Sequence, residues 1–227
     1  IVAGAATSTI TVTARDAIGN PIAGATVVIA ATGTGNTVVQ PVGVTNASGV
    51  ATGTVASTVA AAKTVSVTIN AVAITQTATV TVVPGAVSAA QSLISASPTS
   101  VVAGVATSTV TVTARDANNN VISGATVVLA STGTGNSLTQ PVAVTNASGV
   151  ATGTIASTVA EAKAVSATVG GVAITPTATV TVVPGPISAA QSLVSASPTT
   201  IDAGGPTSTI TVTARDVNGN VIPGATV

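Results

Sequence analysis

The sequence repeats itself with a period of 100 residues. The segment TSTVTVTARDANNN that begins at Thr107 occurs as TSTITVTARDAIGN from Thr7 and as TSTITVTARDVNGN from Thr207, with no insertion between the copies. A solenoid repeat has about 20 to 50 residues and cannot bury a core by itself, whereas about 100 residues suffice for an independent domain. The period therefore predicts a series of separate domains rather than a solenoid.

Two short recurring segments predict where these domains begin and end. A copy ends with Val-Pro-Gly at 83–85 and again at 183–185, and the next copy begins with a segment that contains Ser-Ala-Ala-Gln-Ser. The sequence has neither an initiator Met nor a signal peptide, so we expect it to be part of a longer protein. The expected domains are a first one that lacks its first strand, a complete second one, and the N-terminal part of a third: residues 1–85, 86–185 and 186–227.

Within the complete copy, apolar and polar residues alternate with period two, and helical periodicity is absent. In the segment 108–115, Val110 and Val112 fall on one face and the intervening Thr residues on the other, as expected of a half-buried strand. About seven short strands in about 100 residues, separated by Gly- and Asn-rich turns, are typical of an immunoglobulin-like antiparallel β-sandwich. The predicted strands are 93–97, 108–115, 125–130, 142–145, 150–156, 164–169 and 177–182.

The core of such a domain must be built from small side chains. The chain contains no Phe, Trp, Tyr, Cys or Met. Each buried aromatic side chain would contribute about 150 to 250 Å² of buried area, so the core of each domain is expected to be thin. The alternation predicts nine core residues: Val110, Val112, Val127, Leu129, Ile155, Val165, Val169, Val180 and Val182.

The composition excludes most chemistry. The chain has no His and no Cys, and its five basic and five acidic residues make up 4% of the sequence and cancel to zero net charge. Without these side chains there is no ordinary metal site, thiol nucleophile or imidazole base. Without aromatic residues there is no stacking surface for nucleobases. We therefore expect no enzyme activity, no cofactor and no nucleic-acid partner, and no apolar run is long enough for a membrane-spanning helix.

Four segments of the complete copy resemble a known family. They are GATVVLAS (124–131), TNASGVATGTIAS (145–157), KAVSATVGGV (163–172) and TATVTV (177–182). In this order they resemble the bacterial immunoglobulin-like domain of group 1, the invasin/intimin type, over the whole repeat. Gly153 departs from the family, which usually has a branched apolar residue there. The resemblance implies an extracellular or cell-surface protein whose repeats form a stalk or scaffold, with receptor binding in specialised terminal domains.

The turn after the strand 108–115 is a candidate calcium site. Asp116, Asn118 and Asn120 place oxygen ligands at alternate positions, like the start of a calcium loop. One period earlier the equivalent residues are Asp16 and Asn20, and one period later they are Asp216, Asn218 and Asn220. The loop supplies a single carboxylate, however, and Val127 stands where an EF-hand would have its final acidic ligand. We therefore favour a plain Asx-rich turn over a metal site.

Two further motifs carry weaker hypotheses. Asn46 and Asn146 begin Asn-Ala-Ser, which matches the N-glycosylation acceptor pattern on expected exposed turns, although a tight turn also favours Asn. Lys63 and Lys163 could serve in an isopeptide bond or a Ser-Lys dyad, but we expect their tips to be solvated. The Arg-Asp pairs, of which Arg115-Asp116 is one, are expected to lie in solvent as weak ion pairs.

The near absence of charge suggests how the surface is used. Isolated β-sandwiches usually carry charges that prevent edge-to-edge pairing, and a net charge near zero promotes association. We expect self-association with other copies of the chain, or covalently attached glycans that cover the neutral faces. The expected function is therefore a structural repeat segment, either a stalk or a self-associating filament. The alternative is a set of adhesin repeats that bind a host or neighbouring cell surface directly.

Overall fold

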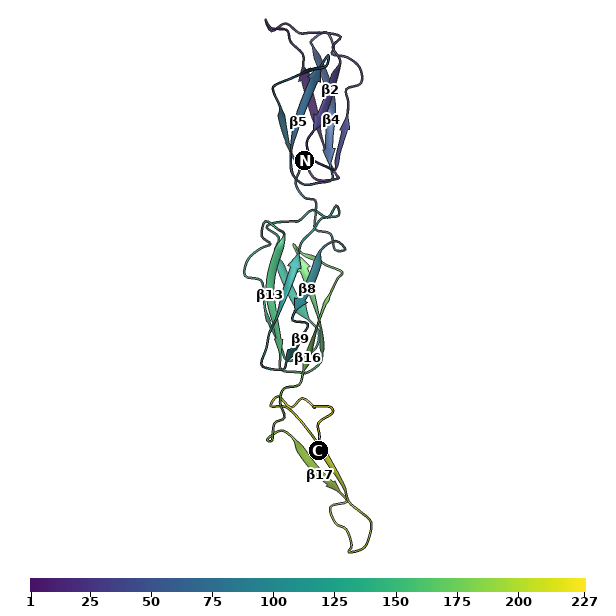
Figure 1. The fold of residues 1–227 in the computed structure, drawn as a ribbon, viewed down its shortest axis with the longest axis vertical. Helices are drawn as coiled ribbons and strands as arrows, with labels where there is room; N and C mark the ends of the chain where they lie inside the picture. Colours follow the sequence, from purple (N-terminus) through teal and green to yellow (C-terminus); the bar gives the residue numbers. More distant parts are fainter. The chain divides into compact units, whose positions relative to one another are not determined.

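The computed structural model describes residues 1–227, which form strands and no helix, as expected. Contacts divide the chain into two compact units. Unit 1 comprises residues 1–91 and 115–122, and unit 2 comprises residues 92–114 and 123–227. Figure 1 shows the strands in sequence colours. The chain contains no helix that could span a membrane.

Most strands of unit 2 form two sheets, an immunoglobulin-like sandwich (Figure 1). One sheet has the order β12-β13-β10-β8, and the other has the order β11-β14-β16-β9 with β15 paired to β14. After Pro98 the chain changes sheet, since β8 pairs with β10 and β9 runs parallel to β16. The bounds are β8 Leu93–Ser97, β9 Ser100–Val102, β10 Ser108–Thr113, β11 Val127–Ser131, β12 Asn136–Thr139, β13 Val150–Ser157, β14 Ala162–Val169, β15 Val172–Ala173 and β16 Ala178–Val183.

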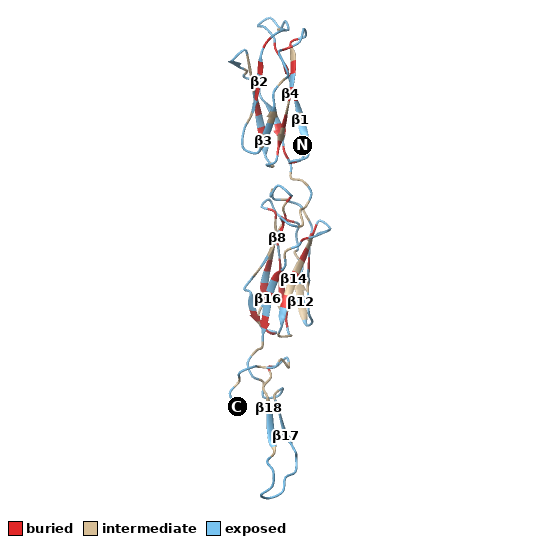
Figure 2. Ribbon diagram, turned by 90° about the vertical axis from the view of Figure 1, so that its right-hand side faces the viewer, coloured by how far each residue is buried: buried red, intermediate tan, exposed pale blue.

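Unit 1 repeats these pairings one period earlier. Its sheets have the orders β1-β4-β3 and β2-β5-β6, and β7 also pairs with β5. The bounds are β1 Thr7–Thr13, β2 Val27–Ala31, β3 Asn36–Val39, β4 Val50–Ser57, β5 Ala62–Ile69, β6 Val72–Ala73 and β7 Ala78–Thr81. Unit 2 also contains an antiparallel pair, β17 (Leu193–Ser197) with β18 (Thr209–Thr213), whose residues are almost all exposed (Figure 2).

The core lies between the sheets, where the alternation places it. All nine predicted core residues are buried, and Val110, Val112, Val165, Val169 and Val180 are 0% exposed. Buried and more exposed residues alternate along β10, β14 and β16. Small Ala residues complete the packing because no aromatic side chain is available.

One predicted strand is wrong. Residues 142–145 are not a strand, and three short strands were not predicted: β9, β15, and β12, which lies just before 142–145. After β12 the side-chain amide of Gln140 accepts a hydrogen bond from Leu129 N at 2.7 Å and donates one to Leu129 O at 2.9 Å. This amide therefore occupies the edge of β11 where another strand would pair. Thr145 lies in a loop, and its buried side chain holds that loop in place because Oγ1 accepts a hydrogen bond from Ala125 N at 2.9 Å.

The structure explains why Gly153 replaces a branched residue. It lies in β13, opposite Val110 and next to the edge strand β12. A Cβ atom added to Gly153 would lie 2.7 Å from Leu129 Cδ1 and would collide with the carbonyl oxygen of Thr139. Gly53 has the same surroundings in unit 1. The two strands approach closely only because this position has no side chain.

We predict that Gly153→Val destabilises unit 2 by about 1–3 kcal/mol, because the added side chain overpacks a site bounded by backbone. The measurement is the urea midpoint of the unit 2 transition. Thr152→Val is the matched control, since Thr152 is exposed on the same strand and its replacement should change stability by less than about 0.5 kcal/mol. Equal midpoints for Gly153→Val and the control would contradict the close-approach explanation.

Candidate functional site

Residues 116–120, with the equivalent residues 16–20 and 216–220, form a compact turn that we call the Asp-Asn loop. In unit 1, Asp116 Oδ1 accepts hydrogen bonds from Asn118 N at 2.9 Å and from Asn120 N at 2.8 Å. Asn119 has a φ of 70°, a left-handed conformation that Asn adopts more readily than most residues. The aspartate therefore folds its own turn by bonding the backbone that follows it.

The second carboxylate oxygen reaches beyond the loop. Asp116 Oδ2 accepts hydrogen bonds from Gly85 N and from Asn120 Nδ2, both at 2.8 Å. The side chain is only 1% exposed. Gly85 is the last residue of the Val-Pro-Gly segment, so the loop is attached to the C-terminal end of the first copy.

Two asparagines bind backbone groups elsewhere in unit 1. Asn120 Nδ2 donates to Thr58 O at 2.9 Å, and Asn120 Oδ1 accepts a hydrogen bond from Ala60 N at 2.9 Å. Asn118 Nδ2 donates to Ala3 O at 3.3 Å. An amide side chain can satisfy a backbone N–H and a backbone C=O at once, and Asn120 does both.

Unit 2 contains the same set of contacts one period later. Asp216 Oδ2 accepts from Gly185 N at 2.9 Å, and Asn218 Nδ2 donates to Ala103 O at 3.3 Å. Asn220 donates to Thr158 O and accepts from Ala160 N, both at 2.9 Å. The docked Asp-Asn loop is thus a repeated feature of the chain.

The first Asp-Asn loop shows that the turn forms without docking. Asp16 Oδ1 accepts from Ile18 N at 3.0 Å and Asn20 N at 2.8 Å, and Asn20 Nδ2 donates to Asp16 Oδ2 at 2.9 Å. These three residues are exposed, and Ile18 replaces the asparagine that reaches outward in the other loops. The loop is therefore preorganised by its own hydrogen bonds, which reduces the entropy lost on docking.

Hydrogen bonding holds both docked carboxylates in the charged form. Burial alone would raise the pKa of Asp116, but hydrogen bonds from Asn120, Gly85 and Asn118 outweigh it and lower the pKa below its usual value. The pKa of Asp216 is lowered in the same way by Asn220, Gly185 and Asn218.

The expectation that the Arg-Asp pairs lie in solvent is wrong for Asp116 and Asp216, which are buried. Arg115 Nη1 donates a hydrogen bond to Asn119 O.

The carboxylate of each docked loop already has protein donors on both oxygens. No group of three or more His, Cys, Asp or Glu side chains could hold a metal ion. These contacts support the Asx-turn interpretation of Asp116, Asn118 and Asn120, and the calcium hypothesis stays a prediction.

Asn46 and Asn146 are exposed, and their Oδ1 atoms accept hydrogen bonds within their own turns. N-glycosylation at these two residues also stays a prediction.

The expectation for the two lysines is wrong. Lys63 and Lys163 are 2% and 0% exposed, and each Nζ donates to a turn carbonyl, that of Thr34 at 2.9 Å or that of Thr134 at 2.6 Å. Along β14, Lys163 shares its inward face with Val165 and Val169. The alternation that located the core valines therefore also pointed to the buried lysine, whereas the general preference of Lys for solvent pointed away from it.

The sequence did not predict that the Asp-Asn loop docks. Its partners are mostly backbone groups of Ala, Thr and Gly residues, which leave no motif in the sequence. One signal of docking was available in the sequence. The two loops that dock have an asparagine at their third position, Asn118 or Asn218, whereas the loop that does not dock has Ile18 there.

The known proteins that this chain resembles in sequence or structure belong to one class, the invasin-type bacterial adhesins. The sequence model of the family described as "Invasin, domain 3" matches residues 1–85 and 88–185. No curated protein matches the chain in sequence. The structure of the Escherichia coli adhesin FdeC is 29% identical, with a TM-score of 0.68, and the match covers 98% of this chain and 72% of that one. InvD of Yersinia pseudotuberculosis is 28% identical, with a TM-score of 0.66 and coverage of 97% and 69%.

A third similar structure is invasin, described as a bacterial integrin-binding protein. It is 27% identical with a TM-score of 0.57, and the match covers 98% of this chain and 46% of that one, so the chain spans about half of the invasin structure. These structures are of bacterial adhesins, and the immunoglobulin-like fold and the surface location expected from the sequence are confirmed. The chain belongs to the invasin domain 3 family of extracellular, immunoglobulin-like adhesin domains.

Proposed function

We propose that this chain is a spacer segment of a surface adhesin, in which the Asp-Asn loops 116–120 and 216–220 each dock on the copy that precedes them. The observation that carries the proposal is that the same outward contacts recur at two places one period apart. In unit 2 they join Asp216 and Asn220 to Gly185, Thr158 and Ala160. A segment whose task is to hold copies in a regular series needs such a link at each junction, whereas a receptor-binding segment does not.

The strength of the link suits this role. A neutral hydrogen bond contributes about 0.5–1.5 kcal/mol net, and one to a charged group about 1.5–3 kcal/mol. Each docked loop makes four such bonds outward, one of them to a carboxylate. Together they favour the docked state clearly while leaving it reversible. Self-association with other copies and covalent glycans are compatible additions and stay predictions.

The alternative, direct binding of a host surface by these repeats, draws on different features. Binding hot spots are enriched in Trp, Tyr and Arg, and the chain has no Trp or Tyr and three Arg residues. Similarity to an integrin-binding protein nevertheless makes integrin the natural ligand for testing this alternative.

We predict that Asn220→Ala loosens the docked loop, because it removes the hydrogen bonds to Thr158 O and Ala160 N. The chain has no Cys, so spin labels can be placed at Val128→Cys and Val217→Cys, both exposed. Pulsed electron paramagnetic resonance should give a narrow distance distribution in the parent and a broad one in the variant. A control pair, Val128→Cys with Val172→Cys, should be unaffected. Identical distributions for parent and variant would show that the loop does not depend on Asn220.

Docking should weaken in acid. Because the pKa of Asp216 is lowered in the folded chain, its contribution is fully present above about pH 4, the ordinary range of an aspartate, and is lost as the pH falls through the lowered pKa. The Val128–Val217 distance distribution should therefore broaden on acidification. Asp216→Asn should be broader than the parent at pH 7 and should not change with pH. A parent distribution that stays narrow below the lowered pKa would refute the role of the carboxylate.

A spacer should not bind the receptor itself. We predict that the immobilised 227-residue chain shows no saturable binding of purified integrin, measured by surface plasmon resonance, with invasin as the positive control. Saturable binding that competes with invasin would favour the adhesin-repeat alternative and would reject a purely spacing role.

A further inference from the structure

Lys63 is a buried cation without an anionic partner. Its side chain is 2% exposed, and Nζ donates one hydrogen bond, to Thr34 O at 2.9 Å. An ammonium group has three N–H donors, and a buried charge is costly unless it is paired. Lys63 therefore has unused donors in a place where an anion would be stabilised.

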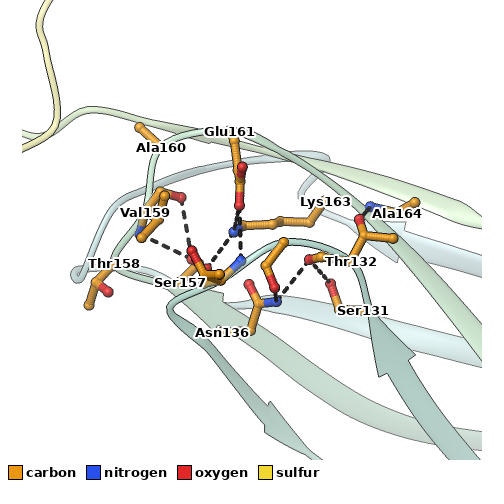
Figure 3. A network of polar contacts seen from close by, with 12 residues as sticks. Ser131, Thr132, Asn136, Ser157, Thr158, Val159, Ala160, Glu161, Lys163 and Ala164 are labelled. Atoms are coloured by element: carbon orange, nitrogen blue, oxygen red, sulfur yellow. Dashed lines mark hydrogen bonds and ion pairs between the residues drawn. The ribbon is translucent and has the colours of Figure 1, made fainter.

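The equivalent lysine in unit 2 has such a partner. Glu161 Oε1 accepts hydrogen bonds from Lys163 Nζ and, at 3.1 Å, from Thr134 N (Figure 3). The Glu161 side chain is 41% exposed, so its carboxylate enters this cradle from the surface. The hydrogen bond and the ionic attraction of Lys163 lower the pKa of Glu161. Two donors, an ammonium and a backbone N–H, thus form a carboxylate cradle.

Unit 1 keeps the cradle and lacks the carboxylate, because Ala61 stands where unit 2 has Glu161. The lysine-to-turn bond is the same, and Ser57 donates to the Thr34 carbonyl as Ser157 does to that of Thr134. Ala61 and Thr34 are exposed, so the position is reachable from solvent.

The glycine beside the cradle shows that the space is open. A Cβ atom added to Gly133 would collide with Glu161 Oε1, which locates the carboxylate directly against this glycine. A Cβ atom added to Gly33 would meet only Lys63, with Nζ at 3.2 Å and Cδ at 3.9 Å. The volume that the carboxylate fills in unit 2 is therefore not filled by any other group in unit 1.

We propose that Lys63 Nζ and Thr34 N form a binding site for a small carboxylate anion such as acetate or formate. The anion takes the place of the Glu161 side chain, with one oxygen between the two donors. Binding neutralises the buried ammonium and stabilises the turn at residues 33–35. The repeats thus differ in kind: the second cradle is closed by its own side chain, and the first is open to a ligand.

The test is titration of the 15N-labelled chain with sodium acetate, against sodium chloride at matched ionic strength. The Thr34 amide should show a saturable shift with acetate only, and the Thr134 amide should not respond. Ala61→Glu, which copies the arrangement in unit 2, should abolish the Thr34 response. Glu161→Ala, which copies unit 1, should create a saturable response at Thr134. Both substitutions reproduce a residue that the other repeat accommodates, so both variants should fold.

Two outcomes would overturn the proposal. A Thr34 response that is equal in chloride, or that persists in Ala61→Glu, would show that the shift is not due to carboxylate binding in the cradle. Absence of a Thr134 response in Glu161→Ala would show that an emptied cradle does not take up a free anion. The readouts are independent of the proposed spacer role, since neither residue belongs to the Asp-Asn loop.

Discussion

The carboxylate of each docked Asp-Asn loop is the group on which the arrangement of neighbouring residues depends. A buried charge is expensive, and here the cost is offset by backbone and amide donors that surround Asp116 and Asp216. One oxygen organises the turn and the other binds Gly85 or Gly185. The same side chain therefore shapes the loop and attaches it, which is why a chain with so few charged residues retains an aspartate at this position in all three copies.

The sandwich itself is built without large side chains, and this limits how the strands can pack. Gly153 lets two strands approach, and Gln140 covers the edge of β11 with an amide instead of another strand. Both features replace what a larger core or an additional strand would provide. Small residues bring the backbones close, and side-chain amides then bond to backbone groups, both within the sandwich and at the docked loop.

Much of the fold could be predicted from period-two alternation, because Val and Thr on opposite faces specify which side is buried. This pattern located β10, β13, β14 and β16 and every predicted core valine. It failed at 142–145, where β-branched residues lie in a loop because Thr145 bonds backbone groups. The same alternation places Lys163 on the buried face of β14, but the preference of Lys for solvent led to the opposite expectation. The candidate site was predictable only as a turn. Its docking partners are backbone groups, and backbone hydrogen bonding between residues distant in sequence leaves no residue-type signal.

Amide hydrogen exchange at Ala160 and Gly185 tests the central claim most directly, because these N–H groups donate to Asn220 and Asp216 and to no strand partner. If the loop is docked, both amides should exchange at least about tenfold more slowly than an open amide, which corresponds to about 1.4 kcal/mol of docking free energy. Exchange at the rate of an unprotected amide at both positions would contradict a docked Asp-Asn loop.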